Sequence, residues 1–204
     1  MAGSNNQMVD YLIDVSVLHS HRIIEAFRAV KRVDFVVNDN APNIYEDYPL
    51  GIGYGQTISQ PRTVAMMMEM LSPKEGQKIL DIGSGSGWTT ALLAYIVGDS
   101  GSVIGVERVE ELVEFGRKNL EKYDFKNAKI VQAEDELGIV GEEFDRILVS
   151  AAASTFPYEL IKQLKVGGKL VIPIQNSVFE IVKKTAGDFD ANEHYGFTFV
   201  PLIY

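Results

Sequence analysis

The chain of 204 residues contains no cysteine, and that absence excludes three kinds of chemistry. A disulfide framework, a thiolate zinc site and a cysteine nucleophile all require this residue. Only three histidines occur, and His19, His21 and His194 have no spacing that would suggest a metal site, so we expect no bound metal. The sequence therefore favours a reaction that needs neither a thiol nor a metal ion.

Long apolar runs and an excess of positive charge are also missing. No uninterrupted apolar stretch approaches the roughly 20 residues of a membrane-spanning helix. The polar residues 1–7 carry no basic-then-apolar secretory signature, and we interpret them as a disordered tail or a cloning remnant. Because the formal net charge is −9, clustered lysine and arginine for nucleic-acid binding are not expected. We predict a cytoplasmic monomer with no membrane or nucleic-acid partner.

Length and composition fit a single domain over residues 8–204. Apolar residues recur at three- and four-residue steps within residues 8–37, which predicts helix. An irregular segment follows, and a further helix is predicted to begin at Pro61, because proline suits the first helical turn. We assign residues 8–75 to a helical and substrate-loop region and residues 76–204 to a cofactor-binding sheet.

From residue 76 onward, short apolar strands alternate with helices, which is typical of a parallel sheet covered on both faces. The pattern predicts strands at 78–82, 102–107, 128–132, 144–150 and 169–174 and helices at 87–97, 109–123 and 157–164. Residues 178–185 and 197–203 are predicted to form an antiparallel edge hairpin, since the polar turn 186–195 is too short for a crossover helix. The expected fold is a doubly wound α/β sheet, mostly parallel, with an N-terminal helical extension.

A glycine-rich turn follows the first predicted strand and opens the next helix. Its residues of interest are Asp81, Gly83, Ser84, Gly85 and Gly87. In such folds ligands bind at the carboxyl ends of the strands, where glycine lets the backbone approach them closely. Glu107 ends the following strand, and a carboxylate at that place can accept hydrogen bonds from both ribose hydroxyls of a nucleoside.

The residue after these glycines distinguishes two kinds of nucleoside cofactor. A dinucleotide fingerprint needs a small third residue, but Trp88 occupies that position, and we interpret it as a packing residue beside the turn. The spacing of the aspartate and the glycines instead resembles S-adenosylmethionine-dependent methyltransferases. In the methyltransferase arrangement, Glu134 or Asp135, after the third strand, would lie beside the adenine amino group. The alternative is that this run of acids is simply a solvated turn.

A second glycine-containing segment, residues 54–61, leads into the helix that begins at Pro61. In one interpretation Ser59 only caps this helix, because serine is a favoured N-cap residue. In the other, free backbone N–H groups and the positive end of the helix dipole form a cradle for an anion, with Gln56, Thr57 and Ser59 adding donors. The second interpretation predicts a site for a substrate carboxylate.

Residues 46–61 resemble the signature of the protein-L-isoaspartate (D-aspartate) O-methyltransferase family. The family's later motifs have counterparts at residues 81–87, 144–153, 163–173 and 199–202. The resemblance implies a Rossmann-like class I methyltransferase fold, with S-adenosyl-L-methionine as cofactor and S-adenosyl-L-homocysteine as product. It also implies methylation of the free carboxylate of L-isoaspartyl and D-aspartyl residues in damaged proteins and peptides. The resulting ester closes to a succinimide, which partly reopens as normal aspartate.

The resemblance also implies roles for individual residues, among them Ser59 as the family's active-site serine. The residues implied around the cofactor are Gln56, Thr57, Ile58, Asp81, Gly83, Ser84, Gly85, Gly87, Glu107, Glu134 and Asp135. The residues implied against the substrate are Tyr54, Ser59, Gln60, Ser150, Ala151, Ala152 and Ala153. Two departures from the family pattern are the missing glycines around the acids at 134–135 and the final residues 202–204.

Carboxylate methylation suits a chain whose motifs contain neither cysteine nor histidine. A free carboxylate has a pKa of about 4 and is already ionised at neutral pH, so no general base is required. Amine or RNA-base methylation often needs a proton acceptor. Two alternatives stay open: a methyltransferase of the same fold that acts on a small molecule, a modified peptide or RNA, and a non-catalytic adaptor that keeps the fold.

Overall fold

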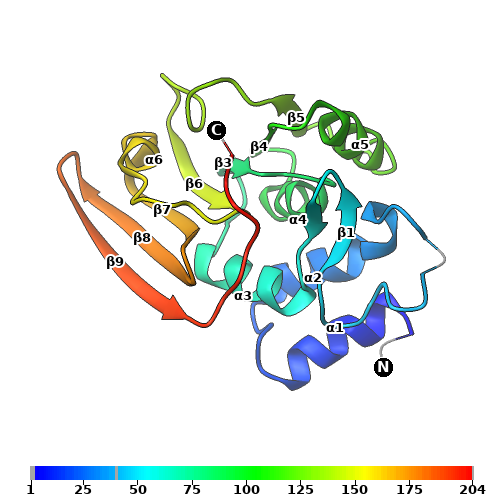
Figure 1. Ribbon diagram of the computed structural model, residues 1–204. Helices are drawn as coiled ribbons and strands as arrows, with labels where there is room; N and C mark the ends of the chain where they lie inside the picture. Colours follow the sequence, from blue (N-terminus) through cyan, green and yellow to red (C-terminus); the bar gives the residue numbers. More distant parts are fainter. Residues whose placement is uncertain (1–2, 40, 204) are drawn as a thin grey trace.

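The computed structural model describes residues 3–39 and 41–203, and its centre is a seven-stranded sheet (Figure 1). The strands lie in the order β5-β4-β3-β6-β7-β8-β9. Neighbouring strands from β5 to β7 pair in parallel, whereas β8 pairs antiparallel with both β7 and β9. Their bounds are β3 Lys78–Ile82, β4 Ser102–Glu107, β5 Ala128–Gln132, β6 Phe144–Val149, β7 Leu164–Ile174, β8 Ser177–Thr185 and β9 Asp188–Tyr195. The predicted doubly wound, mostly parallel α/β fold is confirmed.

The parallel strands are buried because their side chains alternate between two apolar cores, one on each face of the sheet. In β3, for example, Ile79 packs into one core and Leu80 into the other. The first core includes α4 (Trp88–Val97) and the inner side of α5 (Glu110–Leu120). The second core includes the short helix α6 (Tyr158–Lys162). Because the helices pack on the two faces of the sheet, the carboxyl ends of the strands are left free of helices.

The N-terminal helices cover the first core, and they begin earlier than expected. Helix α1 (Asn5–Asp14) starts inside the segment 1–7 that was predicted as a disordered tail, so the prediction is wrong for residues 5–7. Asn5 is buried, its side-chain amide donates to the Phe27 carbonyl (2.8 Å), and its Oδ1 accepts from the Arg32 backbone N–H (3.1 Å). These bonds tie the start of the chain to the next helices. Residues 1–2 lie outside the described residues.

The segment between the N-terminal helix and the sheet contains several short elements. Their bounds are α2 His21–Ala29, η1 Arg32–Phe35 (a 3₁₀ helix), β1 Leu50–Gly53, β2 Gln56–Ile58 and α3 Pro61–Leu71. The helical prediction for residues 8–37 is thus confirmed in part, with a break between α1 and α2. Strands β1 and β2 pair as an antiparallel hairpin whose turn, residues 54–55, has positive φ. The helix predicted from Pro61 is confirmed.

The C-terminal hairpin forms, but its second strand is β9 and not the predicted strand at 197–203. A two-residue turn at 186–187 replaces the long turn predicted at 186–195. β9 is an edge strand with mostly exposed polar side chains, so it lacks the apolar alternation by which strands are recognised.

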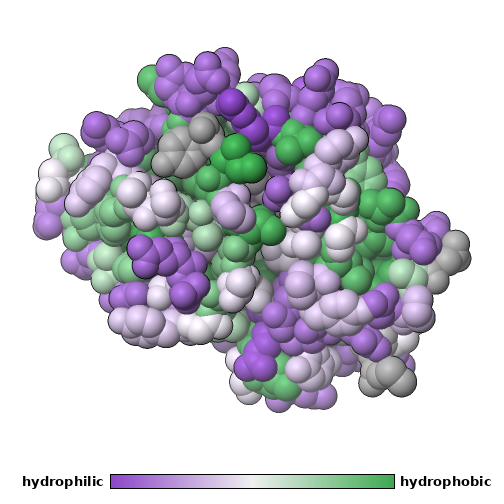
Figure 2. All heavy atoms as spheres, in the orientation of Figure 1, coloured by the Kyte–Doolittle hydropathy of each residue, from purple (hydrophilic) through white to green (hydrophobic). Residues whose placement is uncertain are grey.

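The last residues return across the carboxyl ends of the sheet (Figure 1). The Ala152 N–H donates to the Val200 carbonyl at 2.8 Å, and the Leu202 N–H donates to the Ala152 carbonyl at 2.8 Å. The stretch predicted as a strand is therefore a covering segment, held by the loop after β6. Figure 2 shows apolar, green atoms toward the middle of this face and hydrophilic, purple atoms over much of its periphery. Within the described residues, no helix is long and apolar enough to cross a membrane.

Candidate active site

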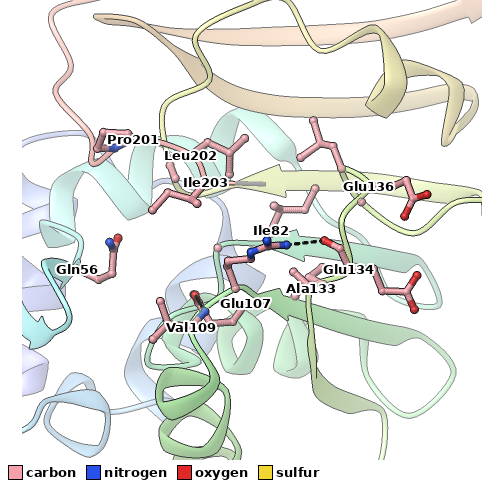
Figure 3. A pocket seen from close by; sticks show the side chains of 16 residues that line it. Gln56, Ile82, Glu107, Val109, Ala133, Glu134, Glu136, Pro201, Leu202 and Ile203 are labelled. Carbon is pink, nitrogen blue, oxygen red and sulfur yellow. Dashed lines mark hydrogen bonds between the residues drawn. The ribbon is translucent and has the colours of Figure 1, made fainter.

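A hollow lies where β3, β4 and β5 end, and we call it the strand-end hollow (Figure 3). Its lining residues are Gln56, Ile82, Gly83, Val106, Glu107, Arg108, Val109, Ala133, Glu134, Glu136, Leu137, Gly138, Ala151, Pro201, Leu202 and Ile203. Apolar side chains form much of the wall, and carboxylates stand at the ends of two neighbouring strands. This combination suits a nucleoside, whose base is a flat ring that packs on apolar side chains and whose ribose carries two hydroxyl donors.

Glu107 is the most buried of the three acids that line the strand-end hollow, with only 7% of its surface exposed. One carboxylate oxygen accepts from the Gly85 N–H at 2.9 Å, and the other accepts from the Val109 N–H at 2.9 Å. Each carboxylate oxygen can accept about two hydrogen bonds, so each keeps a free position. The glutamate therefore supports the glycine turn and can still accept from a diol.

The glycine turn divides into one residue that faces the hollow and several that support it. Gly83 lines the strand-end hollow, with φ of 74° and its N–H bonded to the Val106 carbonyl at 2.9 Å. Gly87 caps α4 with φ of 86°, and a Cβ built there would lie 3.1 Å from the Gly116 carbonyl oxygen. Gly87 thus permits close packing of α4 against α5, while Gly85 supplies the N–H that Glu107 binds.

Asp81 and Ser84, predicted beside the cofactor, are buried behind the turn and do not line the hollow. Asp81 Oδ2 accepts from the hydroxyls of Thr89 (2.7 Å) and Thr90 (2.6 Å) in the first turn of α4. Burial raises the pKa of Asp81 to about 6, although the two threonine hydrogen bonds oppose the shift. The structure thus places Asp81 as a support for the start of α4.

The two acids after β5 point to different places. Glu134 lines the strand-end hollow, and its carbonyl accepts from Arg108 Nη1 at 3.1 Å, a bond drawn in Figure 3. The Asp135 side chain is 96% exposed and borders a separate groove beyond Leu137. Of the two candidates that the sequence left open, the structure brings Glu134 to the hollow and turns Asp135 away. Glu136, which was not among the predicted site residues, also lines the hollow.

The 54–61 segment contributes to the strand-end hollow and to a second one, which we call the serine hollow. The serine hollow is lined by Pro49, Thr57, Ser59, Gln60, Thr63, Ser150, Thr198, Phe199 and Val200. The two hollows are adjacent, because consecutive residues line them at three places in the chain. The strand-end hollow is lined by Gln56, Ala151 and Pro201, and the serine hollow by their neighbours Thr57, Ser150 and Val200. A ligand in the strand-end hollow and a ligand beside Ser59 would therefore be neighbours.

Two residues predicted in this segment line neither hollow. Ile58 is buried in the first core, and Tyr54 stands 60% exposed on the β1–β2 turn. The predicted helix-start cradle is also corrected in part. The N-cap of α3 is Gln60, so Ser59 is not the cap, and Asp47 Oδ1 already accepts from the Arg62 N–H at 2.9 Å. The donors left for an anion are mainly the polar side chains of the serine hollow.

The segment after β6 was predicted to lie against the substrate, and the structure divides it. Ser150 lines the serine hollow and Ala151 the strand-end hollow. The backbone of Ala152 is paired with Val200 and Leu202, and the Ala153 N–H donates to the Pro173 carbonyl at 2.9 Å. Only the first two residues of the segment are thus placed to meet a ligand.

Sequence reasoning missed the contribution of residues 201–203, because it assigned them to an edge strand. It also missed Arg108, which follows Glu107 and bonds the Glu134 carbonyl, and the apolar walls Ile82 and Val106. A signal was available, since these three residues stand at the predicted strand ends, where ligands of such folds bind. Among the described residues, no group of three or more histidine, aspartate or glutamate side chains could hold a metal ion.

A mostly parallel seven-stranded sheet with a glycine turn after β3, and an acid at the end of the neighbouring strand β4, is the arrangement of a Rossmann-like class I methyltransferase. The model of the protein-L-isoaspartate(D-aspartate) O-methyltransferase family matches residues 3–204. The chain therefore belongs to this family.

Relatives and solved structures agree with this assignment. A protein-L-isoaspartate O-methyltransferase of Methanopyrus kandleri is 41% identical over 206 residues, covering 98% of this chain and 91% of that protein. One from Methanothrix thermoacetophila is 42% identical, covering 90% of this chain and 89% of that protein. A Plasmodium falciparum protein described as a protein-L-isoaspartate O-methyltransferase, crystallised with S-adenosyl-L-homocysteine, superposes with a TM-score of 0.89. It is 26% identical, and the match covers 99% of both chains.

Proposed function

We propose that the protein is a repair methyltransferase that methylates the free carboxylate of L-isoaspartyl and D-aspartyl residues in damaged proteins and peptides. The observation that carries the proposal is the family match over residues 3–204. The match includes residues 54–61, which we call the serine segment and which lie beside the strand-end hollow. Acidic composition supports a protein substrate over RNA, because the formal net charge is −9.

The residues of the strand-end hollow fit S-adenosyl-L-methionine. Glu107 would accept from the ribose hydroxyls, Gly83 lets the backbone approach the ligand, and Glu134 would lie toward the adenine amino group. When bound, this cofactor supplies a methyl group that is activated by a positively charged sulfur. Gln56 extends from the serine segment into the same hollow, and the next residue, Thr57, lines the serine hollow, so Gln56 would lie near both ligands.

The serine hollow would hold the substrate carboxylate. Ser59, Thr57 and Ser150 offer hydroxyl donors that can orient one carboxylate oxygen and leave the other free to attack. No proton has to be removed, because a carboxylate is ionised at neutral pH. The work left to the protein is therefore orientation and exclusion of water.

The test is to incubate the protein with methyl-labelled S-adenosyl-L-methionine and two peptides that differ only in having L-aspartate or L-isoaspartate at one position. We expect transfer to the isoaspartyl peptide alone. Equal transfer to both peptides, or to neither, would contradict the proposal.

We further propose, from composition, that the protein acts as a monomer in the cytoplasm. Light scattering after gel filtration checks the monomer.

A further inference from the structure

Arg32 is a fully buried cation, with 0% exposure, at the start of η1 beneath the serine segment. Each guanidinium nitrogen donates to a different backbone carbonyl: Nε to Ile44 (2.9 Å), Nη1 to Ser59 (2.8 Å) and Nη2 to Tyr48 (3.3 Å). The planar fork of arginine suits such a bridge, whereas lysine offers only a point charge. One side chain thus joins three points between residues 44 and 59.

The same guanidinium lies over the ring of Trp88, with 4.8 Å between Cζ and the ring centroid. Trp88 is the first residue of α4 and follows the glycine turn directly, and it is also packed edge-on against Phe27. Arg32 therefore contacts the carbonyl of the predicted active-site serine on one side and the helix that begins at the cofactor turn on the other. Neither Arg32 nor Trp88 lines either of the two hollows.

Burying this cation is costly, since an unpaired charge is stable inside a protein only with compensation. Burial lowers the pKa of Arg32 to about 9, and the charge of Asp47 opposes part of that shift. Asp47 also accepts the Arg62 N–H in the first turn of α3 at 2.9 Å, so it binds the chain just after the serine segment. The serine segment is held from below by Arg32 and at its helix end by Asp47.

We propose that Arg32 is a positioning residue for methyl transfer, which sets the Ser59 backbone against the glycine turn without touching substrate or cofactor. The proposal rests on the proposed function, because it needs Ser59 to meet the substrate. Its consequence is that the loss of the fork should lower the turnover rate more than cofactor affinity. A merely structural arginine would lower the stability and leave the kinetics of the folded protein unchanged.

The test compares R32K and R32M with R146K. Arg146 is a matched control, because it also donates to backbone carbonyls, those of Leu71 (2.9 Å) and Asp145 (2.7 Å), but at the other end of α3 from Ser59. For R32K we expect kcat on an isoaspartyl peptide to fall by about 30- to 100-fold, the scale of a misplaced catalytic group. The Kd for S-adenosyl-L-homocysteine should change by less than about threefold, R32M should fall further, and R146K should keep kcat within about twofold.

The chain's one tryptophan, Trp88, adds a spectroscopic reading. Because Arg32 joins Ser59 to the Trp88 ring, a tryptophan-free isoaspartyl peptide should change Trp88 emission in the wild type and not in R32K. An unchanged kcat in folded R32K overturns the proposal. If R32K does not fold, wild-type emission that stays constant at saturating peptide overturns it, and a change supports it. A wild type that methylates no isoaspartyl peptide contradicts the proposed function, whereas a normal wild-type rate with an unchanged R32K rate contradicts only the role of Arg32.

Discussion

Replacing Glu107 by glutamine is expected to weaken cofactor binding strongly while keeping the shape of the side chain. In the structure its two oxygens accept the N–H groups of Gly85 and Val109 at 2.9 Å each. A ribose diol would use the remaining position on each oxygen. In glutamine one oxygen becomes an NH2 group, which cannot accept, so one ribose hydroxyl loses its partner and the other faces a neutral acceptor.

The size of the effect follows from the charge of this acceptor. A hydrogen bond to a charged group contributes about 1.5–3 kcal/mol, and a neutral one contributes about 1 kcal/mol. One lost bond (about 1.5–3 kcal/mol) and one weakened bond (about 0.5–2 kcal/mol) together predict about 2–5 kcal/mol, which is roughly a thirty- to several-thousand-fold rise in Kd. Stability should fall as well, by about 1–3 kcal/mol, because a backbone N–H beside the glutamine NH2 loses its acceptor.

Calorimetric titration with S-adenosyl-L-homocysteine measures the affinity, and thermal unfolding checks that E107Q is folded at the temperature used. Asp135→Asn is the matched control, since it removes an acid that lies three residues after the end of the neighbouring strand β5 and has a 96% exposed side chain. Its Kd should equal that of the wild type. A folded E107Q with a Kd within about threefold of the wild type would refute the ribose assignment.

Three further predictions concern the serine, the buried acid and the glycine cap. S59A should lower methylation of an isoaspartyl peptide by at least about tenfold with unchanged S-adenosyl-L-homocysteine affinity, and equal losses would make Ser59 structural. The pKa of Asp81 rises on folding from 3.8 to about 6, so its contribution is fully present below pH 3.8 and is lost as pH rises through about 6. Urea unfolding should therefore show the stability of wild type relative to D81N falling by about 2 kcal/mol from pH 4 to 7. A difference that stays flat over this range would contradict the shift. G87A should lower the free energy of unfolding, measured by the same urea titration, by about 2 kcal/mol or more, because φ at Gly87 is 86° and an added Cβ would lie 3.1 Å from the Gly116 oxygen. G187A is the control and should be nearly neutral, since a Cβ at Gly187 would meet nothing within 4 Å.

The parts of the fold that could be predicted are those with strong apolar patterns. Strands β3, β4 and β5 have the predicted bounds, because buried parallel strands are short apolar runs between turns. The glycine turn and Glu107 were found through their position at strand ends. Strand β9 was missed because an exposed edge strand carries few apolar residues, and the covering segment at 197–203 was then misassigned in its place.

The finer points of the site depended on contacts between distant segments. Sequence could not distinguish Glu134 from Asp135, because the difference depends on how the chain turns beside Arg108 and Leu137. Nor could it identify Arg32, whose partners lie 12 to 27 residues away in a segment without regular pattern. An isolated arginine before a short helix has no local signature, since its role arises only from tertiary packing.

The serine hollow contains no lysine or arginine among the described residues that line it, although its proposed ligand is an anion. The nearby cation Arg32 directs its donors to backbone carbonyls. This arrangement suits the reaction, because the carboxylate loses its charge as it becomes an ester. A cation bonded to the carboxylate would stabilise the starting state more than the transition state and would slow the transfer. Hydroxyl groups orient the oxygen more weakly, so we infer that the buried arginine provides position without providing charge at the reacting atom.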